Sequence, residues 1–225
     1  MPFTEKAPAF LFENYTRNDK EWFQSNKGTY QKALVEPFTE LIEYLSPLMG
    51  KIDPEIICTP KKISRLYRDA RYAKGKSIFR ESIWCSLCRR KERFISKPEF
   101  YFYISPDGFG WGCGYYQTPT TVMENLRSLI IEKDKIAVAA LKAFDKQSRF
   151  ELQGELYKRD HFPEQPKKLK EWLNRKSLSV SFDCDDPALL FSKDLKETIR
   201  SDFESIADIY RLFIKAEEMN AGKQV

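Results

Sequence analysis

The sequence predicts an α+β fold: a single domain in which a largely antiparallel sheet of about five to six strands is packed by N-terminal, central and C-terminal helices. Three observations support this prediction. Apolar residues recur every three or four positions near both ends of the chain, as in amphipathic helices. Short β-rich runs with brief connections occupy the middle, which favours an antiparallel meander. No linker-like stretch separates two halves.

The first helix is predicted to begin near residue 18. Asn18 is followed three positions later by Glu21, an arrangement typical of a capping box. A second helix is predicted over residues 30–48, where apolar residues recur at helical spacing, with Gly50 as its end. Pro37 either kinks this second helix or begins its second part.

The sheet is predicted from four β-rich runs in the middle of the chain, over residues 63–69, 78–87, 100–105 and 109–116. A Pro-Asp-Gly turn at residues 106–108 joins the last two runs as an antiparallel hairpin. The remaining predictions are helices over residues 119–130, 136–144 and 167–174, strands over 150–157 and 178–182, and one long helix over 199–213. We expect the core to span about residues 8–217 and residues 218–225 to be frayed.

The composition predicts a cytoplasmic protein without a membrane span. The N-terminus lacks a cationic segment followed by an apolar one, and the apolar runs are far shorter than the roughly 20 residues that cross a bilayer. An odd number of irregularly spaced cysteines does not fit a disulfide framework and favours a reducing compartment. The cysteines are Cys58, Cys85, Cys88, Cys113 and Cys184. The sequence predicts no particular cofactor or oligomeric state.

Charge is distributed unevenly along the chain. Residues 61–93 hold twelve cations against three anions, a net charge of +9, whereas the whole chain has a formal net charge of +5. The other residues therefore carry −4. Such asymmetry indicates that the basic segment is where an anionic partner would bind.

Arginines of this segment form the candidate site. In an extended run from Arg65 to Arg71, period-two geometry places Arg65, Tyr67, Asp69 and Arg71 on one face. One carboxylate does not balance three guanidinium groups, and arginine forks suit carboxylate or phosphate oxygens. We therefore predict a pocket for a phosphate-bearing or carboxylate-bearing small ligand. The predicted ligand-binding residues are Arg65, Tyr67, Arg68, Asp69, Arg71, Lys76, Arg80, Lys158 and Arg159.

Four alternatives to this interpretation stay open, and one of them is a scaffold that binds another protein. The arginines could form a structural ion-pair network. The basic segment could bind a nucleic-acid backbone, with Tyr67, Tyr72 and Trp84 available for stacking on bases. The protein could be an enzyme in which Asp69, Tyr67 or His161 transfers a proton beside an arginine-stabilised anion. No nucleophile, metal set or paired carboxylate motif singles out a reaction.

The run Arg65-Leu66-Tyr67-Arg68-Asp69-Ala70-Arg71-Tyr72, followed by Lys76, resembles the signature of a bacterial and fungal family known as domain of unknown function 2461. Segments at residues 22–30, 102–104, 112–115, 126–127, 154, 158–159, 162–163, 173 and 176 resemble its pattern in the same order. After Lys76 the family tends to continue Thr-Pro-Tyr-Lys-Thr, whereas residues 77–81 here are Ser-Ile-Phe-Arg-Glu, which indicates a divergent member. The resemblance implies no reaction and no cofactor.

Three further patterns have both a functional and a structural interpretation. Glycines at alternate positions from 108 to 114 leave one strand face bare, so that either a ligand or another part of the protein can approach closely. Cys85-x-x-Cys88 lacks a second pair at metal spacing, so core cysteines are favoured over a zinc site and no metal is predicted. His161, the single histidine, lies in a polar run that either closes over a site or forms a surface turn.

Overall fold

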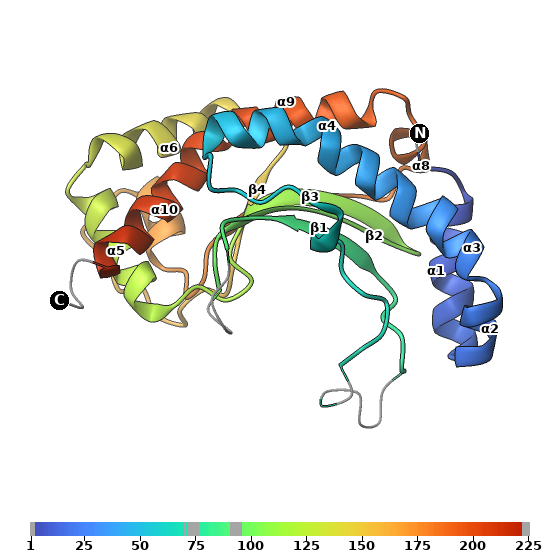
Figure 1. Cartoon of the computed structure of the whole chain (residues 1–225). Helices are drawn as coiled ribbons and strands as arrows, with labels where there is room; N and C mark the ends of the chain where they lie inside the picture. The colour runs from blue at the N-terminus through green and yellow to red at the C-terminus, as the bar shows by residue number, and fades with distance from the viewer. Residues whose placement is uncertain (1–2, 70, 72–76, 91–95, 222–225) are drawn as a thin grey trace. The chain divides into compact units, whose positions relative to one another are not determined.

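The computed structural model describes residues 3–69, 71, 77–90 and 96–221, which fold as an α+β structure with one open antiparallel sheet (Figure 1). This confirms the predicted fold class. The sheet order is β1-β2-β3-β5-β4. Its strands are β1 (Ile83–Leu87), β2 (Glu99–Ser105), β3 (Gly108–Gly114), β4 (Glu151–Gln153) and β5 (Ser179–Cys184). The predicted hairpin is present, because β2 and β3 are neighbours joined by a two-residue turn at residues 106–107.

The chain forms two compact units. The first comprises Met1–Leu87, Tyr101–Trp111 and Asp183–Arg200, and the second comprises Cys88–Phe100, Gly112–Phe182 and Ser201–Val225. Strands β2, β3 and β5 contribute residues to both units. A single domain over residues 1–225 therefore stays a prediction.

The helices of the first unit are α1 (Lys6–Arg17), α2 (Lys20–Ser25), α3 (Lys27–Tyr30), α4 (Glu36–Ile52) and α8 (Pro187–Leu190), with a 3₁₀ turn η2 (Pro60–Lys62). The N-cap of α2 is Asp19, whose carboxylate accepts hydrogen bonds from the amides of Glu21 and Trp22. Asn18, the predicted cap, instead ends α1 in the left-handed conformation with φ 50°.

The second predicted helix is divided into three parts. A π-helical segment, η1 (Gln31–Val35), separates α3 from α4, and Pro37 lies in the first turn of α4. Of the two alternatives for Pro37, the structure therefore has the one in which it begins the second part of the helix, directly after the π-helical segment. The predicted end at Gly50 is wrong, because α4 continues to Ile52 and ends where Asp53 is extended.

Aromatic rings form the core of the first unit. Phe3 packs edge-on against Phe38 with ring centroids 5.2 Å apart, and against Phe102 at 5.6 Å. Phe102 also contacts Phe38 at 5.4 Å and Trp111 at 6.3 Å. All four side chains are buried. This cluster joins the segment before α1 to α4 and the β2–β3 hairpin.

The second unit contains α5 (Thr120–Ile131), α6 (Lys135–Lys146), α7 (Lys167–Leu173) and α10 (Ala207–Ala221), while α9 (Leu195–Ser205) has residues in both units. The prediction of one long C-terminal helix is wrong, because the chain breaks between α9 and α10 at Ile206. There the amide of Ile209 donates to the carbonyl of Ile206, three residues earlier, which tightens the turn. In the second unit Phe100 stacks on Tyr210 at 4.9 Å and packs on Phe203.

The predicted frayed tail begins too early. Helix α10 extends to Ala221, and residues 222–225 lie outside the described residues. Glu218 forms an ion pair with Arg89 at 2.9 Å, and Glu217 forms one with Lys97. These contacts attach the final turns of α10 to the segment before β2, which the isolated sequence of the tail could not indicate.

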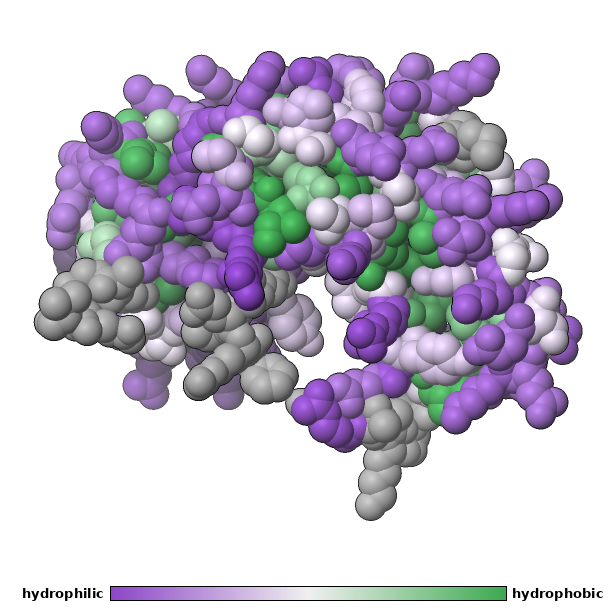
Figure 2. Space-filling view, in the orientation of Figure 1, coloured by the Kyte–Doolittle hydropathy of each residue, from purple (hydrophilic) through white to green (hydrophobic). Residues whose placement is uncertain are grey.

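Hydrophilic side chains cover most of the molecular face in Figure 2, and apolar residues are visible only in restricted areas. Within the described residues, every helix is either too short or too polar to cross a membrane.

Candidate anion-binding site

Six of the predicted site residues lie on an irregular antiparallel pairing that we call the arm, formed by residues 63–69 and 71 on one side and 77–85 on the other. They are Arg65, Tyr67, Arg68, Asp69, Arg71 and Arg80. In Figure 1 the arm is the pair of teal segments next to η2 and β1. Isolated bridges pair Ile63 with Cys85 and Tyr67 with Phe79. Backbone hydrogen bonds of 2.7–2.8 Å connect the two sides around these bridges.

Residues 63–69 are therefore extended but do not form the predicted regular strand. In an antiparallel ladder, hydrogen-bonded residues exchange two backbone bonds. Here the amide of Trp84 donates to the side-chain hydroxyl of Ser64 at 3.0 Å, and the amide of Ile78 donates to Oδ1 of Asn18 at 2.7 Å. Side-chain oxygens thus replace two backbone acceptors and interrupt the ladder.

The arm is anchored to the N-terminal helices by Tyr67 and Asn18. The ring of Tyr67 packs between Phe79 at 4.7 Å and Phe23 at 5.3 Å, and its hydroxyl accepts a hydrogen bond from Gln24. Oδ1 of Asn18 also accepts from the hydroxyl of Ser77 at 2.7 Å. Tyr67 therefore has a packing role, although its hydroxyl was predicted to bind the ligand.

Replacing Asn18 should loosen the arm. Asn18→Gly keeps the left-handed conformation but removes the acceptor of two hydrogen bonds, so we expect the free energy of unfolding to fall by about 1–2 kcal/mol. We also expect faster amide exchange at Ile78. Urea unfolding and hydrogen exchange measure these effects. Lys133→Gly is the matched control, because Lys133 also has a positive φ, of 55°, and is exposed. An equal loss of stability in the control would contradict the anchoring role.

Two guanidinium groups are held close together on the arm. Nε of Arg68 donates to the carbonyl of Phe79 at 3.1 Å, and Arg80 donates to the carbonyl of Arg65 at 3.2 Å. The guanidinium of Arg80 also lies over the ring of Trp84, 4.8 Å from its centroid. Burial lowers the pKa of Arg80, the positive charge of Arg68 lowers it further, and the negative charge of Asp69 partly opposes both effects. The backbone and Trp84 thus fix two like charges near each other.

The arm has two acidic residues, Asp69 and the exposed Glu81, and Arg71 forms an ion pair with Asp69. The Arg71 guanidinium contacts both carboxylate oxygens, with Nη2 at 2.5 Å from Oδ2 and Nε at 3.0 Å from Oδ1. These hydrogen bonds, with one from the Arg71 amide, lower the pKa of Asp69 to about 2. A carboxylate with this pKa is a weak general base at neutral pH, so the geometry does not favour proton transfer by Asp69.

The other predicted residues have three different placements. Arg65 is exposed on the arm, and its side chain forms no hydrogen bond or ion pair with the described residues. Lys76 lies outside the described residues. Lys158 and Arg159 are exposed in the second unit, in the connection between β4 and α7. The structure thus brings Arg65, Arg68 and Arg80 to one arm, and the role of Lys158 and Arg159 stays a prediction.

Sequence reasoning missed Arg127, which organises that connection in the second unit. Its guanidinium donates to the carbonyls of Leu173 at 2.9 Å and Arg175 at 2.7 Å, and it lies over the ring of Tyr157. His161 stacks on the same Tyr157 ring, with centroids 4.4 Å apart. The isolated motif Leu126-Arg127 gave no sign of this role, because the partners are more than 25 residues away and mostly backbone carbonyls.

The strand glycines serve close approach of backbone. A Cβ at Gly108 would lie 2.8 Å from the carbonyl oxygen of Cys184, and one at Gly114 would lie 2.4 Å from the Cα of Ser179. Both contacts are with β5, the neighbour of β3 in the sheet. At these two positions the bare face accommodates a strand, which supports the structural interpretation over a ligand site.

None of the five cysteines, all of which lie in the described part of the chain, forms a disulfide bond, and Cys85 and Cys88 are both buried. Across residues 3–69, 71, 77–90 and 96–221, no three His, Cys, Asp or Glu side chains converge on a common position suited to a metal ion.

Comparison with known proteins identifies a family without assigning an activity. The model of the family described as "Conserved hypothetical protein (DUF2461)" matches residues 6–211. No curated protein matches the chain. The match therefore adds no reaction or ligand to the geometry above.

Proposed function

We propose that this chain, which belongs to the conserved hypothetical protein family DUF2461, binds a phosphate-bearing or carboxylate-bearing small ligand through Arg65, Arg68 and Arg80 of the arm. One observation carries the proposal: Arg68 and Arg80 repel each other, yet backbone carbonyls hold each in place. An anion between them relieves this repulsion and engages the remaining N–H groups.

The surroundings of these arginines also favour an external anion. Among the described residues, neither Arg68 nor Arg80 forms an ion pair, and the nearby carboxylate of Asp69 is bonded to Arg71. Arg80 is half-buried, so its charge is screened less by solvent than that of a fully exposed side chain. The backbone hydrogen bonds fix part of each side chain before binding, which lowers the entropy cost of association.

A small ligand suits this geometry better than single-stranded nucleic acid. Stacking needs an open aromatic face, but Tyr67 is packed between two phenylalanines and one face of Trp84 is covered by Arg80. Tyr72 lies outside the described residues. Among the described aromatic candidates at most the second face of Trp84 is left for a base, so a nucleic acid would bind mainly through its phosphates, with an affinity that falls steeply with salt and little base preference.

The test compares two double variants that remove the same charge. Pyrophosphate and citrate should raise the melting temperature of the wild-type protein at fixed ionic strength, because a ligand at 100 times its Kd stabilises the folded state by about 2.7 kcal/mol. In Arg68→Gln/Arg80→Gln this increase should be lost. In Lys61→Gln/Arg90→Gln it should persist, since both control residues are exposed members of the same basic segment.

Each increase is measured from the variant's own melting temperature without ligand, which separates binding from any direct loss of stability. An equal loss in both double variants would indicate non-specific charge attraction. If neither anion raises the melting temperature of the wild type, the proposal is wrong. An oligonucleotide that binds at low salt with unchanged affinity in Arg68→Gln/Arg80→Gln would also oppose it.

A further inference from the structure

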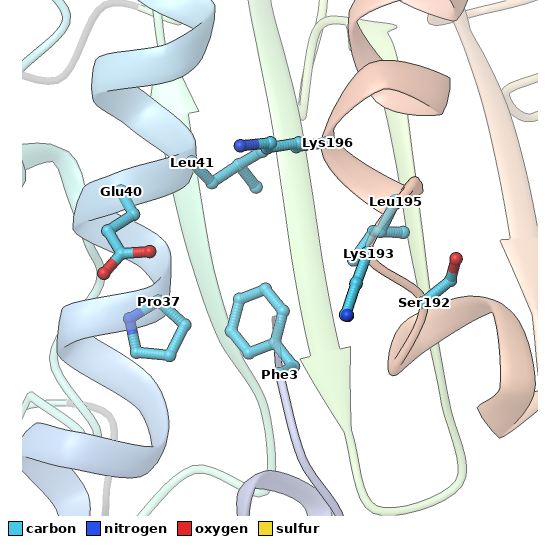
Figure 3. A pocket seen from close by; sticks show the side chains of 8 residues that line it. All are labelled: Phe3, Pro37, Glu40, Leu41, Ser192, Lys193, Leu195 and Lys196. Carbon is cyan, nitrogen blue, oxygen red and sulfur yellow. The ribbon is translucent and has the colours of Figure 1, made fainter. Parts of the chain in front are cut away.

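A cavity of about 310 Å³ lies in the first unit, at the junction of three segments that are distant in sequence. Its lining comes from the residues before α1, from α4, and from the connection between α8 and α9 together with the first turn of α9 (Figure 3). The lining residues are Phe3, Pro37, Glu40, Leu41, Ser192, Lys193, Leu195 and Lys196. None of these belongs to the arm, so the cavity is a separate candidate site.

The floor of the cavity is apolar and held in place by the core. Phe3 lies at the centre of the close-up view in Figure 3, and its ring is fixed by Phe38 and Phe102. Leu41 and Leu195 are each only 4% exposed. A floor of this kind favours the apolar part of a ligand, because contact removes apolar surface from water without disturbing the packed side chains.

The rim of the cavity carries two ammonium groups. Lys196 extends from α9 toward α4 in Figure 3 and lies 4.8 Å from the ring centroid of Tyr44, another α4 residue. Lys193 is exposed, and it has no hydrogen bond or ion pair within the described part of the chain. Glu40 is the single acidic residue among those that line the cavity, so the lining carries a positive excess. The aliphatic stems of both lysines extend the apolar wall below their charges.

We propose that this cavity binds a small carboxylic acid with an apolar body, with the carboxylate at Lys193 and the body on Phe3, Leu41 and Leu195. The volume lies at the small end of the range for ligand cavities, roughly 300–1,000 Å³, which selects a compact ligand. A lysine ammonium acts as a point charge and does not require the bidentate geometry of an arginine site. Ser192 also lines the cavity, and its hydroxyl accepts a hydrogen bond from the amide of Asp194 at 3.0 Å while its O–H is left to donate.

Three sets of probes test the two halves of this proposal. Phenylacetate and hexanoate combine a carboxylate with an apolar body, acetate has the carboxylate alone, and 2-phenylethanol has an apolar body without charge. Binding is measured by isothermal titration and by ligand-observed NMR. We expect at least one of the two acids to bind the wild-type protein at least tenfold more tightly than either acetate or 2-phenylethanol.

Matched variants then assign the site. Lys193→Gln removes one exposed charge and should weaken binding of the acid at least tenfold, whereas Lys27→Gln, an exposed lysine on α3, should leave the affinity unchanged. If neither acid binds at millimolar concentration, if 2-phenylethanol binds equally well, or if Lys193→Gln retains full affinity, the proposal is wrong. Phenyl phosphate binding tenfold more tightly than phenylacetate would overturn the assignment of a carboxylate ligand.

Binding of the acid in the cavity should not depend on the arginines of the arm. Arg68→Gln/Arg80→Gln should bind phenylacetate as the wild type does, and Lys193→Gln should keep its response to pyrophosphate. Loss of phenylacetate binding in the arm variant would contradict a separate site.

Discussion

Gly154→Ala should destabilise the protein by about 3 kcal/mol or more, because this position combines two independent obstacles to any side chain. Its φ is +124°, a region that residues with a Cβ rarely adopt, and an added Cβ would lie 1.9 Å from the carbonyl oxygen of Ser177. That oxygen belongs to the backbone, so it cannot move away as the end of a flexible side chain would. The Gly154 carbonyl also accepts a hydrogen bond from Arg175 at 2.7 Å, which the shift would disturb.

The control for this variant is the same substitution at a glycine with open space. Gly28 lies in α3, and no other side chain or backbone segment comes within 4 Å of the position that a Cβ would occupy there. Gly28→Ala should therefore raise the free energy of unfolding by about 0.4–1 kcal/mol. Urea unfolding of both variants measures the contrast. A loss below 1 kcal/mol in Gly154→Ala would show that the backbone around Ser177 relaxes freely, contrary to the tight contact described here.

The fold was predictable where the residue pattern of a single segment is enough to indicate its secondary structure. The β2–β3 hairpin follows from β-rich runs on either side of a Pro-Asp-Gly turn, and α6 and α7 were placed within two residues of their observed ends. Helix α1 was missed, although Ala7, Phe10, Leu11 and Asn14 are buried at helical spacing. That pattern was available in the sequence and would have predicted the helix.

Other features depend on contacts that a sequence does not reveal. The interruption of residues 63–69 requires Asn18, which accepts a hydrogen bond from the amide of Ile78, 60 residues later in the chain. The order of the last strands in the sheet, with β5 between β3 and β4, requires a long connection to return beside the hairpin. Both are tertiary effects that override local β propensity.

The candidate site was predicted in part. Clustered charge identified the segment, and the structure brings Arg68 and Arg80 within range of each other's charge, on opposite sides of the arm. The period-two geometry of a regular strand predicts Asp69 on the same face as Arg65 and Arg71 and on the opposite face from Arg68. The alternation of side chains could not indicate that the guanidinium of Arg71 would bond to both carboxylate oxygens of Asp69. That pairing depends on the rotamers of two side chains that are two residues apart. The cavity beside Lys193 had no signal in the sequence, since its lining joins Phe3 to residues as distant as Lys196.

Phe102→Ala should be the most damaging change in the first unit, with an expected loss of about 3–5 kcal/mol in the free energy of unfolding. Phe102 is fully buried and contacts the rings of Phe3, Phe38 and Trp111, so truncation leaves a cavity among three aromatic side chains. Aromatic pairs add about 0.5–1.5 kcal/mol each beyond buried area, which places the loss toward the upper end of this range.

The matched control is Phe12→Ala, which removes the same side chain from a position that is 60% exposed on α1. Its effect should stay within about 0.5 kcal/mol, because surface substitutions without specific contacts change stability little. Chemical denaturation measures the free energy of unfolding of both variants. Because both lose the same phenylalanine side chain, the difference between them reports the effect of burial. Similar losses in the two proteins would mean that the aromatic cluster does not hold Phe3 in place, and the floor of the Lys193 cavity would then lack the rigid support on which a preformed ligand site depends.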